Sequence, residues 1–320
     1  MIGRRGAIAT GFAVATGAAQ AQPAWPDRPL RLIVGYPAGG PSDVFARLTA
    51  GQIAPRLGQS IVVENRPGGG AVLASETVAR AAADGLTWLH VDNGILVYNP
   101  ALYARLPYDP DRDFAGVGFI GRFPLYIVCR AEAPWADFAA LLAAGRARAP
   151  TYGSPAVASP HHLAMELVKR RSGLAAEHVP YRGGQAAMQD LLAGNVDLVM
   201  IDTATGLPFI RDGRVRALAV LTEARTAEAP AVPTMRELGT DAVAFGWQGI
   251  SVPKGVPAEI VARLNAELVR AVASEEVQAR TRALGIQTTG WSAAEFDRFV
   301  AAENALWRPL IRELGIRLDA

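Results

Sequence analysis

The stretch LRLIVGYPAGGPSD, from Leu30 to Asp43, decides how this chain is expected to fold. Its first five residues, Leu30 to Val34, are apolar and typical of a buried strand, and a Pro/Gly turn follows them. Ser42 is the predicted N-cap of a helix that runs to about Leu57. The first N–H groups of such a helix have no partner within it and lie at the positive end of its dipole. The sequence therefore predicts a turn whose backbone can bind an anion.

Short apolar runs alternate with helical patterns along the rest of the chain, which is typical of a mostly parallel sheet in an α/β protein. In the first half, strands are predicted at 30–34, 61–64, 87–90, 115–120 and 125–129. After a middle segment the chain returns through a strand predicted at 246–252. We therefore expect two domains joined by a two-stranded hinge. Residues 22–130 and 223–320 are predicted to form the first domain, and residues 131–222 an inserted second domain.

The beginning of the chain has the features of an export signal. Arg4 and Arg5 precede an apolar segment that ends near Ala18, and Ala19-Gln20-Ala21 matches an A-x-A cleavage site. Cleavage after Ala21 is expected to leave a soluble protein in the periplasm. The paired arginines leave the twin-arginine route open, although the residues around them favour the general secretory route.

The composition of the mature chain argues against several partners. Removal of the two leader arginines leaves 30 basic against 30 acidic residues, so no basic excess supports a nucleic-acid partner. The single cysteine, Cys129, lies in an apolar run and is predicted to be a packed side chain. Neither a metal nor a cofactor is predicted. The adjacent His161 and His162 point to different sides of a helix, and no phosphate-binding glycine motif ends in Lys-Ser or Lys-Thr.

Loops at four predicted strand ends are rich in hydroxyl groups, small residues and free backbone amides. They are residues 36–40 and 92–94 in the first domain, and 154–159 and 202–205 in the second. Ligands of open α/β sheets bind outside the carboxyl ends of the strands. The sequence therefore predicts a ligand held in a cleft between two domains.

Sequence segments along nearly the whole mature chain resemble one family, the solute-binding receptors of tripartite tricarboxylate transporters, also called the Bug family. They include WPDRPLRLIVGYPAGGPSD at 25–43, VVENRPGGG at 62–70, YGSPAVASPHHLAMEL at 152–167 and HVPYRGGQAAMQDLLAGNVDL at 178–198. The resemblance implies a type II periplasmic binding protein fold, whose cleft closes on a small carboxylate held mainly by backbone amides. One difference is that Ala156 and Ala158 stand where the family commonly has glycines, which is expected to narrow or stiffen the pocket.

The resemblance also implies which residues bind the ligand. In the first domain, Tyr36, Ala38, Gly39 and Gly40 are expected to contact the ligand, and Asp43 to order the start of the helix. Asn93 stands where the family usually has a small hydroxyl residue. The expected contacts from the second domain are Ser154, Ser159, His162, Asp202 and Thr203.

The predicted function is a monomeric periplasmic receptor that captures a small organic carboxylate and delivers it to a membrane transporter without chemistry. Two alternatives stay open at this point. One is a ligand sensor for a membrane kinase. The other is an exported hydrolase that uses Ser154, His162 and Asp202, although no G-x-S-x-G motif is present.

Overall fold

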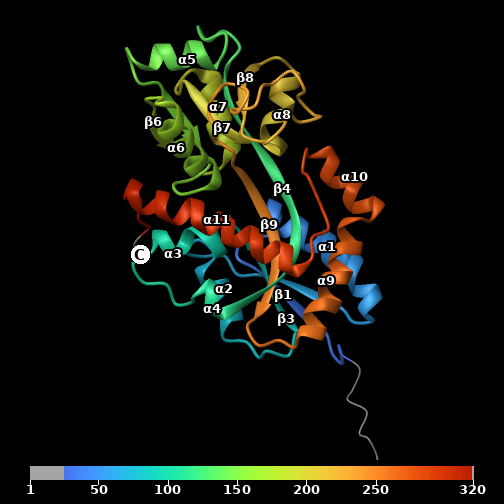
Figure 1. The fold of residues 1–320 in the computed structure, drawn as a ribbon. Helices are drawn as coiled ribbons and strands as arrows, with labels where there is room; N and C mark the ends of the chain where they lie inside the picture. The colour runs from blue at the N-terminus through green and yellow to red at the C-terminus, as the bar shows by residue number, and fades with distance from the viewer. Residues whose placement is uncertain (1–24, 319–320) are drawn as a thin grey trace, which may run out of the picture.

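The computed structural model describes residues 25–318 (Figure 1). The predicted export signal and its cleavage site lie outside the described residues. The strands are β1 Leu30–Val34, β2 Ile61–Asn65, β3 Thr87–Asp92, β4 Phe114–Arg130, β5 Thr151–Ser154, β6 Glu177–Pro180, β7 Leu198–Asp202, β8 Val215–Val220 and β9 Phe245–Pro253. The helices are α1 Pro41–Leu57, α2 Val72–Ala79, the π-helix η1 Gly94–Tyr98, α3 Asn99–Leu102, α4 Pro110–Asp113, α5 Phe138–Gly145, α6 Pro160–Ser172, α7 Gly184–Ala193, α8 Thr203–Arg211, α9 Ala258–Val272, α10 Glu275–Ala283 and α11 Ala293–Leu314. None of these helices is both long and apolar enough to cross a membrane.

The strands form one sheet in the order β2-β1-β3-β9-β4-β7-β5-β6, with β8 also paired to β4. β1 is parallel to β2 and β3, and β5 is parallel to β6 and β7. The two central strands, β4 and β9, are antiparallel to all their neighbours. The predicted parallel units are therefore present toward both ends of the sheet, with an antiparallel centre between them.

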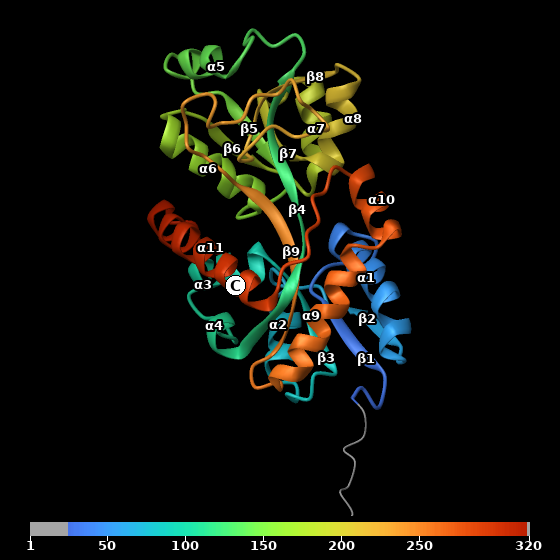
Figure 2. The same ribbon diagram turned by 45° about the vertical axis from the view of Figure 1, so that its right-hand side comes forward.

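The sheet spans two lobes that β4 and β9 join (Figures 1 and 2). We call the part with β1, β2, β3 and α9 to α11 the first lobe, and the part with β5 to β8 the second lobe. Residues 114–124 of β4 pair with β9, whereas residues 125–130 pair with β7 and β8. The prediction of separate strands at 115–120 and 125–129 is wrong, because register shifts near Gly118 and Gly121 bend β4 without ending it.

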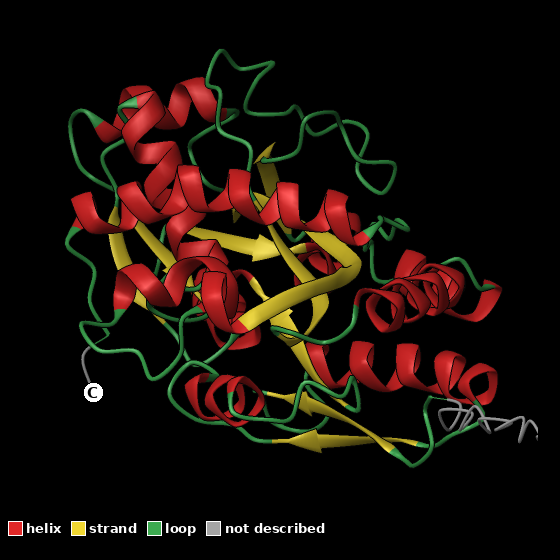
Figure 3. Cartoon of the chain, turned by 60° about the horizontal axis from the view of Figure 1, so that its bottom comes forward, coloured by secondary structure: helices red, strands yellow, loops and turns green. Residues whose placement is uncertain are grey.

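Helices cover both faces of the sheet (Figure 3). Leu32, Phe45 and Trp88 belong to a core cluster in the first lobe, where α1 packs beside α9. A second cluster lies in the second lobe, and a third spans the joining strands and includes Trp247. Burial of one large apolar side chain contributes about 1.5–3 kcal/mol. These clusters therefore hold the strands, and with them the strand-end loops, in fixed positions.

Candidate functional site

The loop after β1 is organised by the carboxylate of Asp43. Ala38 and Gly39 are exposed, and Gly39 has a φ of 80°, which is a conformation that glycine adopts at little cost. The Gly39 N–H donates to Asp43 Oδ2 at 2.9 Å, Arg47 Nε donates to the same oxygen at 3.0 Å, and Asn65 Nδ2 donates to Oδ1 at 2.9 Å. Burial alone would raise the pKa of Asp43, but these hydrogen bonds outweigh it and lower the pKa to about 2. Asp43 is therefore an anion at neutral pH and orders the loop through these hydrogen bonds.

The start of α1 leaves backbone N–H groups without acceptors. Gly40 is the N-cap and has no side chain to accept a hydrogen bond. The prediction that Ser42 caps the helix is wrong, because Pro41 already occupies the first helical position, where its missing N–H is not needed. Ser42 Oγ instead accepts from Gln248 Nε2 of β9 at 3.1 Å. Within residues 25–318, the N–H groups of Ser42 and Asp43 have no acceptor.

Tyr36 contacts the end of β3. Its hydroxyl donates a short hydrogen bond to Asp92, and the other carboxylate oxygen of Asp92 accepts the Ile95 N–H at 3.0 Å. Burial raises the pKa of Asp92, and burial beside this carboxylate raises the pKa of Tyr36 well above its ordinary value. The sequence predicted a loop at this point but did not identify Asp92 as the partner that holds Tyr36.

Asn93 is only 1% exposed and is bound to the joining strand β9. Its Oδ1 accepts the Trp247 N–H at 2.8 Å, and its Nδ2 donates to the Phe245 carbonyl at 3.3 Å. A third contact of 3.4 Å joins Nδ2 to the Glu303 carboxylate of α11. Both polar atoms of Asn93 are therefore engaged inside the protein, and the side chain links β3, β9 and α11.

The loop after β5 is closed by its own hydrogen bonds. Ser154 Oγ lies 2.7 Å from His178 Nε2 and 3.1 Å from the Ala156 carbonyl. Ser159 is the N-cap of α6, because its Oγ accepts the His162 N–H at 3.2 Å, and the same hydroxyl donates to the Ala156 carbonyl at 2.8 Å. The loop is therefore preorganised by contacts that need no ligand.

His162 is packed inside the second lobe. Its Nδ1 accepts the Ala158 N–H at 3.0 Å, which places the ring proton on Nε2 in the neutral form. The ring stacks on His178 with a centroid distance of 3.7 Å and an interplanar angle of 9°. Burial, together with the nearby His178 and Lys169, lowers the pKa of His162 to about 3. Ala158 has a φ of 58°, so this loop holds a non-glycine residue in the left-handed region.

Asp202 caps α8 and contacts His161. Its Oδ1 accepts the Thr205 N–H at 2.9 Å, and its Oδ2 lies 3.2 Å from His161 Nε2. Burial alone would raise the pKa of Asp202, but the contacts with His161 and Thr205 together outweigh it and lower the pKa. Thr203 is fully buried beside Gly285. A Cβ added at Gly285 would lie 2.9 Å from the Thr203 Cβ, so the two residues are in close contact. The sequence analysis predicted no role for His161, and its position beside His162 was the only indication of one in the sequence.

The three residues of the hydrolase alternative do not form a relay in the structure. Ser154 pairs with His178, whereas His162 Nδ1 already accepts a backbone N–H. The imidazole near Asp202 belongs to His161. In the described part of the chain, no hydrogen bond joins any two of Ser154, His162 and Asp202. Ser154, His162 and Asp202 therefore do not form the nucleophile, base and acid set that this alternative requires.

The candidate residues follow the ends of β1, β3, β5 and β7, as the sequence predicted. None of them lines any of four well-defined cavities in residues 25–318, so the ligand contacts stay a prediction. Among residues 25–318, no group of three His, Cys, Asp or Glu side chains is arranged to hold a metal ion.

Comparisons with known proteins identify the class of protein. The chain is similar to an R. palustris protein whose structure contains adipate, with 32% identity, a TM-score of 0.79, and coverage of 92% of this chain and 100% of the other. It is also similar to MatC from Rhodopseudomonas palustris, solved with bound malate, with 30% identity, a TM-score of 0.76, and coverage of 90% and 100%. The structure of the periplasmic binding protein BugD is similar as well, with 30% identity, a TM-score of 0.76, and coverage of 92% and 100%. The predicted fold, a two-domain α/β periplasmic binding protein whose domains are joined by two strands, is therefore confirmed.

The family follows from sequence. Residues 45–316 match the family model described as "Tripartite tricarboxylate transporter family receptor". The protein BugT of Bordetella pertussis is 35% identical over 298 residues, which cover 92% of this chain and 91% of BugT. This protein belongs to the TctC family of tripartite tricarboxylate transporter receptors, which are periplasmic solute-binding receptors.

Proposed function

We propose that this protein captures a small organic carboxylate in a cleft between its two lobes and delivers it to the membrane subunits of a tripartite tricarboxylate-type transporter. The observation that carries the proposal is the uncapped start of α1 at the carboxyl end of β1. A carboxylate placed there can accept the free N–H groups of Ser42 and Asp43 at the positive end of a 17-residue helix.

The second lobe provides matching donors. The Ala156 and Val157 N–H groups at the end of β5 have no acceptor among the residues that the structure describes. We propose that the ligand is held between these amides and the start of α1, with Tyr36, Ser154 and the other predicted contact residues around it. The adipate and malate in two similar structures support a short dicarboxylate as the ligand class.

The rest of the predicted biology belongs to the same proposal. The export signal is removed after Ala21, the mature protein acts as a monomer in the periplasm, and it releases its ligand unchanged. Residues 131–222 form the lobe that moves relative to residues 22–130 and 223–320. Mass spectrometry of the exported protein and light scattering test the first two statements. Uptake of the identified ligand with and without this receptor tests delivery, and uptake that is unchanged without the receptor would refute it.

Ligand capture is tested by thermal denaturation against malate, adipate, other dicarboxylates, aromatic acids and amino acids. A specific ligand at 100 times its Kd adds about 2.7 kcal/mol of stability. The decisive variant is Gly40→Asp, because Gly40 has the extended φ of −75° and ψ of 169° that an aspartate N-cap adopts. Its carboxylate is expected to occupy the free amides itself and to repel the ligand.

Gly40→Ala is the matched control, since it adds the same Cβ without the carboxylate. Each hydrogen bond between an N–H group and a carboxylate contributes about 1.5–3 kcal/mol, so Gly40→Asp is expected to weaken binding by about 100-fold or more. Gly40→Ala is expected to stay close to the native affinity. Equal binding by Gly40→Asp and Gly40→Ala would refute the placement at α1, and turnover of any panel member would refute the assignment as a receptor without chemistry.

A further inference from the structure

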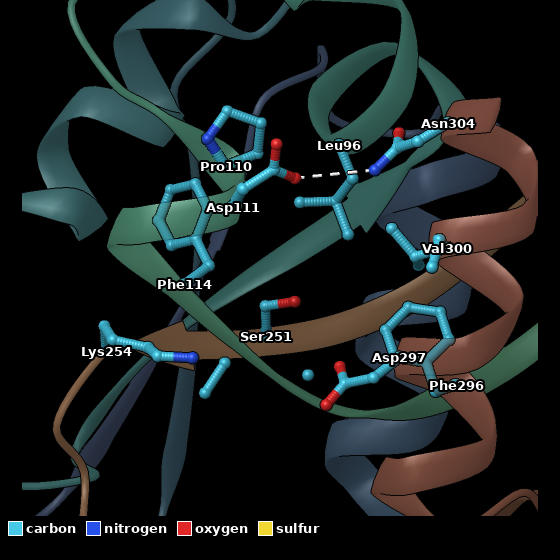
Figure 4. Close-up of a pocket in the computed structure, with 13 residues that line it drawn as sticks. Leu96, Pro110, Asp111, Phe114, Ser251, Lys254, Phe296, Asp297, Val300 and Asn304 are labelled. Atoms are coloured by element: carbon cyan, nitrogen blue, oxygen red, sulfur yellow. Dashed lines mark hydrogen bonds between the residues drawn. The ribbon is translucent and has the colours of Figure 1, made fainter. Parts of the chain in front are cut away.

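A cavity in the first lobe lies away from the strand-end loops. It has a volume of about 200 Å³, is open to solvent on one side, and is lined by the start of β4, the end of β9, η1, α4 and α11 (Figure 4). Ser251 on its floor pairs with Leu89 of β3, three residues before Asp92. The cavity therefore lies about 10 Å along the sheet from the strand end that carries the candidate ligand residues.

Two buried polar atoms of this cavity lack a partner. Ser251 is 1% exposed, and its Oγ has no hydrogen bond within residues 25–318. Asn304 Oδ1 on α11 also has no hydrogen bond within residues 25–318, although Asn304 Nδ2 donates to Asp111 at 3.4 Å. Buried polar groups are almost always hydrogen-bonded, and an unpaired one costs about 1–3 kcal/mol. The free Ser251 hydroxyl, which faces the cavity in Figure 4, therefore indicates a polar occupant.

Two opposite charges stand at the walls of the cavity. Figure 4 shows the Lys254 ammonium and the Asp297 carboxylate on opposite sides, with Ser251 between them. Both side chains are exposed and neither forms an ion pair of 4.0 Å or less within residues 25–318, but the Asp297 carboxylate accepts a hydrogen bond from the Gly116 backbone and is attracted by Lys254. By contrast, the third charge at the cavity, Asp111, is neutralised by two hydrogen bonds from Arg308 at 2.6 and 3.0 Å. Lys254 and Asp297 therefore offer one positive and one negative contact, on opposite sides of the cavity, for a ligand that carries both signs.

Size and apolar lining restrict the ligand further. Cavities that hold drug-sized ligands measure about 300–1,000 Å³, so this one takes only a few heavy atoms. Its remaining walls include the apolar side chains of Leu96, Phe114, Phe296 and Val300. These walls suit one or two methylene groups and no long or bulky side chain.

We propose that this cavity is a second ligand site, which binds a small zwitterion of the amino-acid class. The carboxylate of the ligand lies against Lys254 and the Ser251 hydroxyl, and its ammonium lies against Asp297. A hydroxyl on the ligand can donate to Asn304 Oδ1 at the far end, so serine fits the site better than alanine. The site is independent of the proposed carboxylate cleft.

The test uses L-serine as the probe, with propionate and ethanolamine as ligands that carry only one of the two charges. Isothermal titration of the whole protein is expected to show saturable one-site binding of serine at millimolar concentrations. Propionate and ethanolamine are expected to bind at least about tenfold more weakly, because each loses one charged contact.

Three variants locate the site. Lys254→Met and Asp297→Asn are each expected to weaken serine binding by about tenfold or more, while the binding of a carboxylate in the cleft stays unchanged. Gly40→Asp, which blocks the start of α1, is expected to leave serine binding unchanged. The proposal is overturned if serine shows no saturable binding up to about 50 mM, if propionate binds equally well, or if Gly40→Asp abolishes serine binding while the other two variants keep it.

Discussion

Replacement of Glu303 by glutamine is expected to stabilise the protein at alkaline pH. Glu303 lies on α11 against the joining strand, where its Oε2 accepts the Trp247 Nε1–H at 3.0 Å. Burial raises the pKa of Glu303 to about 7, and the hydrogen bond from Trp247 lowers it only in part. The carboxyl group therefore changes its charge near neutral pH, next to a strand that joins the two lobes.

The sign and the size of the effect follow from linkage. The ordinary pKa is 4.5, so between pH 4.5 and about 7 the folded protein holds a proton on Glu303 that the unfolded chain has lost. The free energy of unfolding therefore falls as the pH rises through this interval, and the loss is complete above about pH 7. The difference of about 2.5 between the two pKa values corresponds to about 3 kcal/mol. Glu303→Gln removes this loss and keeps an acceptor for Trp247.

The assay is denaturant unfolding at pH 5 and pH 8, followed by tryptophan fluorescence. Relative to the native protein, Glu303→Gln is expected to gain about 2–3 kcal/mol at pH 8 and much less at pH 5. Other groups, such as His90 with a pKa lowered by burial to about 4, titrate equally in both proteins and cancel in the difference. Glu313→Gln is the control, because this side chain lies on the same helix and is 52% exposed, so that the loss of its surface ion pair with Arg170 is expected to change the stability little. A variant at position 303 that is no more stable than native at pH 8, or that loses stability there, would refute the reasoning.

Three further substitutions or reactions test other parts of the structure. Gly246→Ala would place a Cβ 1.8 Å from the Phe123 ring and is expected to cost about 1–3 kcal/mol or more in a urea melt, with rescue by a second change, Phe123→Ala. Asp43→Asn is expected to lower the free energy of unfolding by about 2 kcal/mol at pH 7, measured by urea unfolding. The lowered pKa of Asp43 stabilises the fold above the ordinary pKa of 3.8, and this stabilisation is lost as the pH falls through about 2. The difference between native protein and variant should therefore shrink toward pH 2. Burial raises the pKa of Cys129 to about 11, so a disulfide reagent is expected to label it only after unfolding, and rapid labelling of the native protein would contradict its buried position.

Local signals in the chain predicted many elements well. The strand predicted at 30–34 has the observed bounds, and the helix predicted to run to about Leu57 ends there, because apolar runs and helical spacing act over only a few residues. The predicted strand ends are also where the candidate loops lie. The N-cap at Ser42 was wrong, since Pro41 competes for the same turn and Ser42 is used by Gln248 from more than 200 residues away.

The side-chain partners were not predictable in the same way. The sequence placed His162 in a loop expected to contact a ligand, but it could not show that His162 stacks on His178 and accepts the Ala158 N–H. Asn93 was placed at a strand end, yet its hydrogen bonds to β9 depend on strand pairing between residues about 150 positions apart. Such contacts depend on sheet order and register, which short sequence patterns do not encode.

By itself, the sequence determined the α/β class, the strand-end loops and the family, because these depend on hydrophobic periodicity, turn residues and ordered motifs. Only the tertiary structure decided that β4 runs unbroken between the lobes, that Glu303 is buried against Trp247, and that Lys254 and Asp297 face one cavity. The physical reason is that local propensity selects helices and strands, whereas burial, charge separation and hydrogen-bond partners arise only when distant segments pack together.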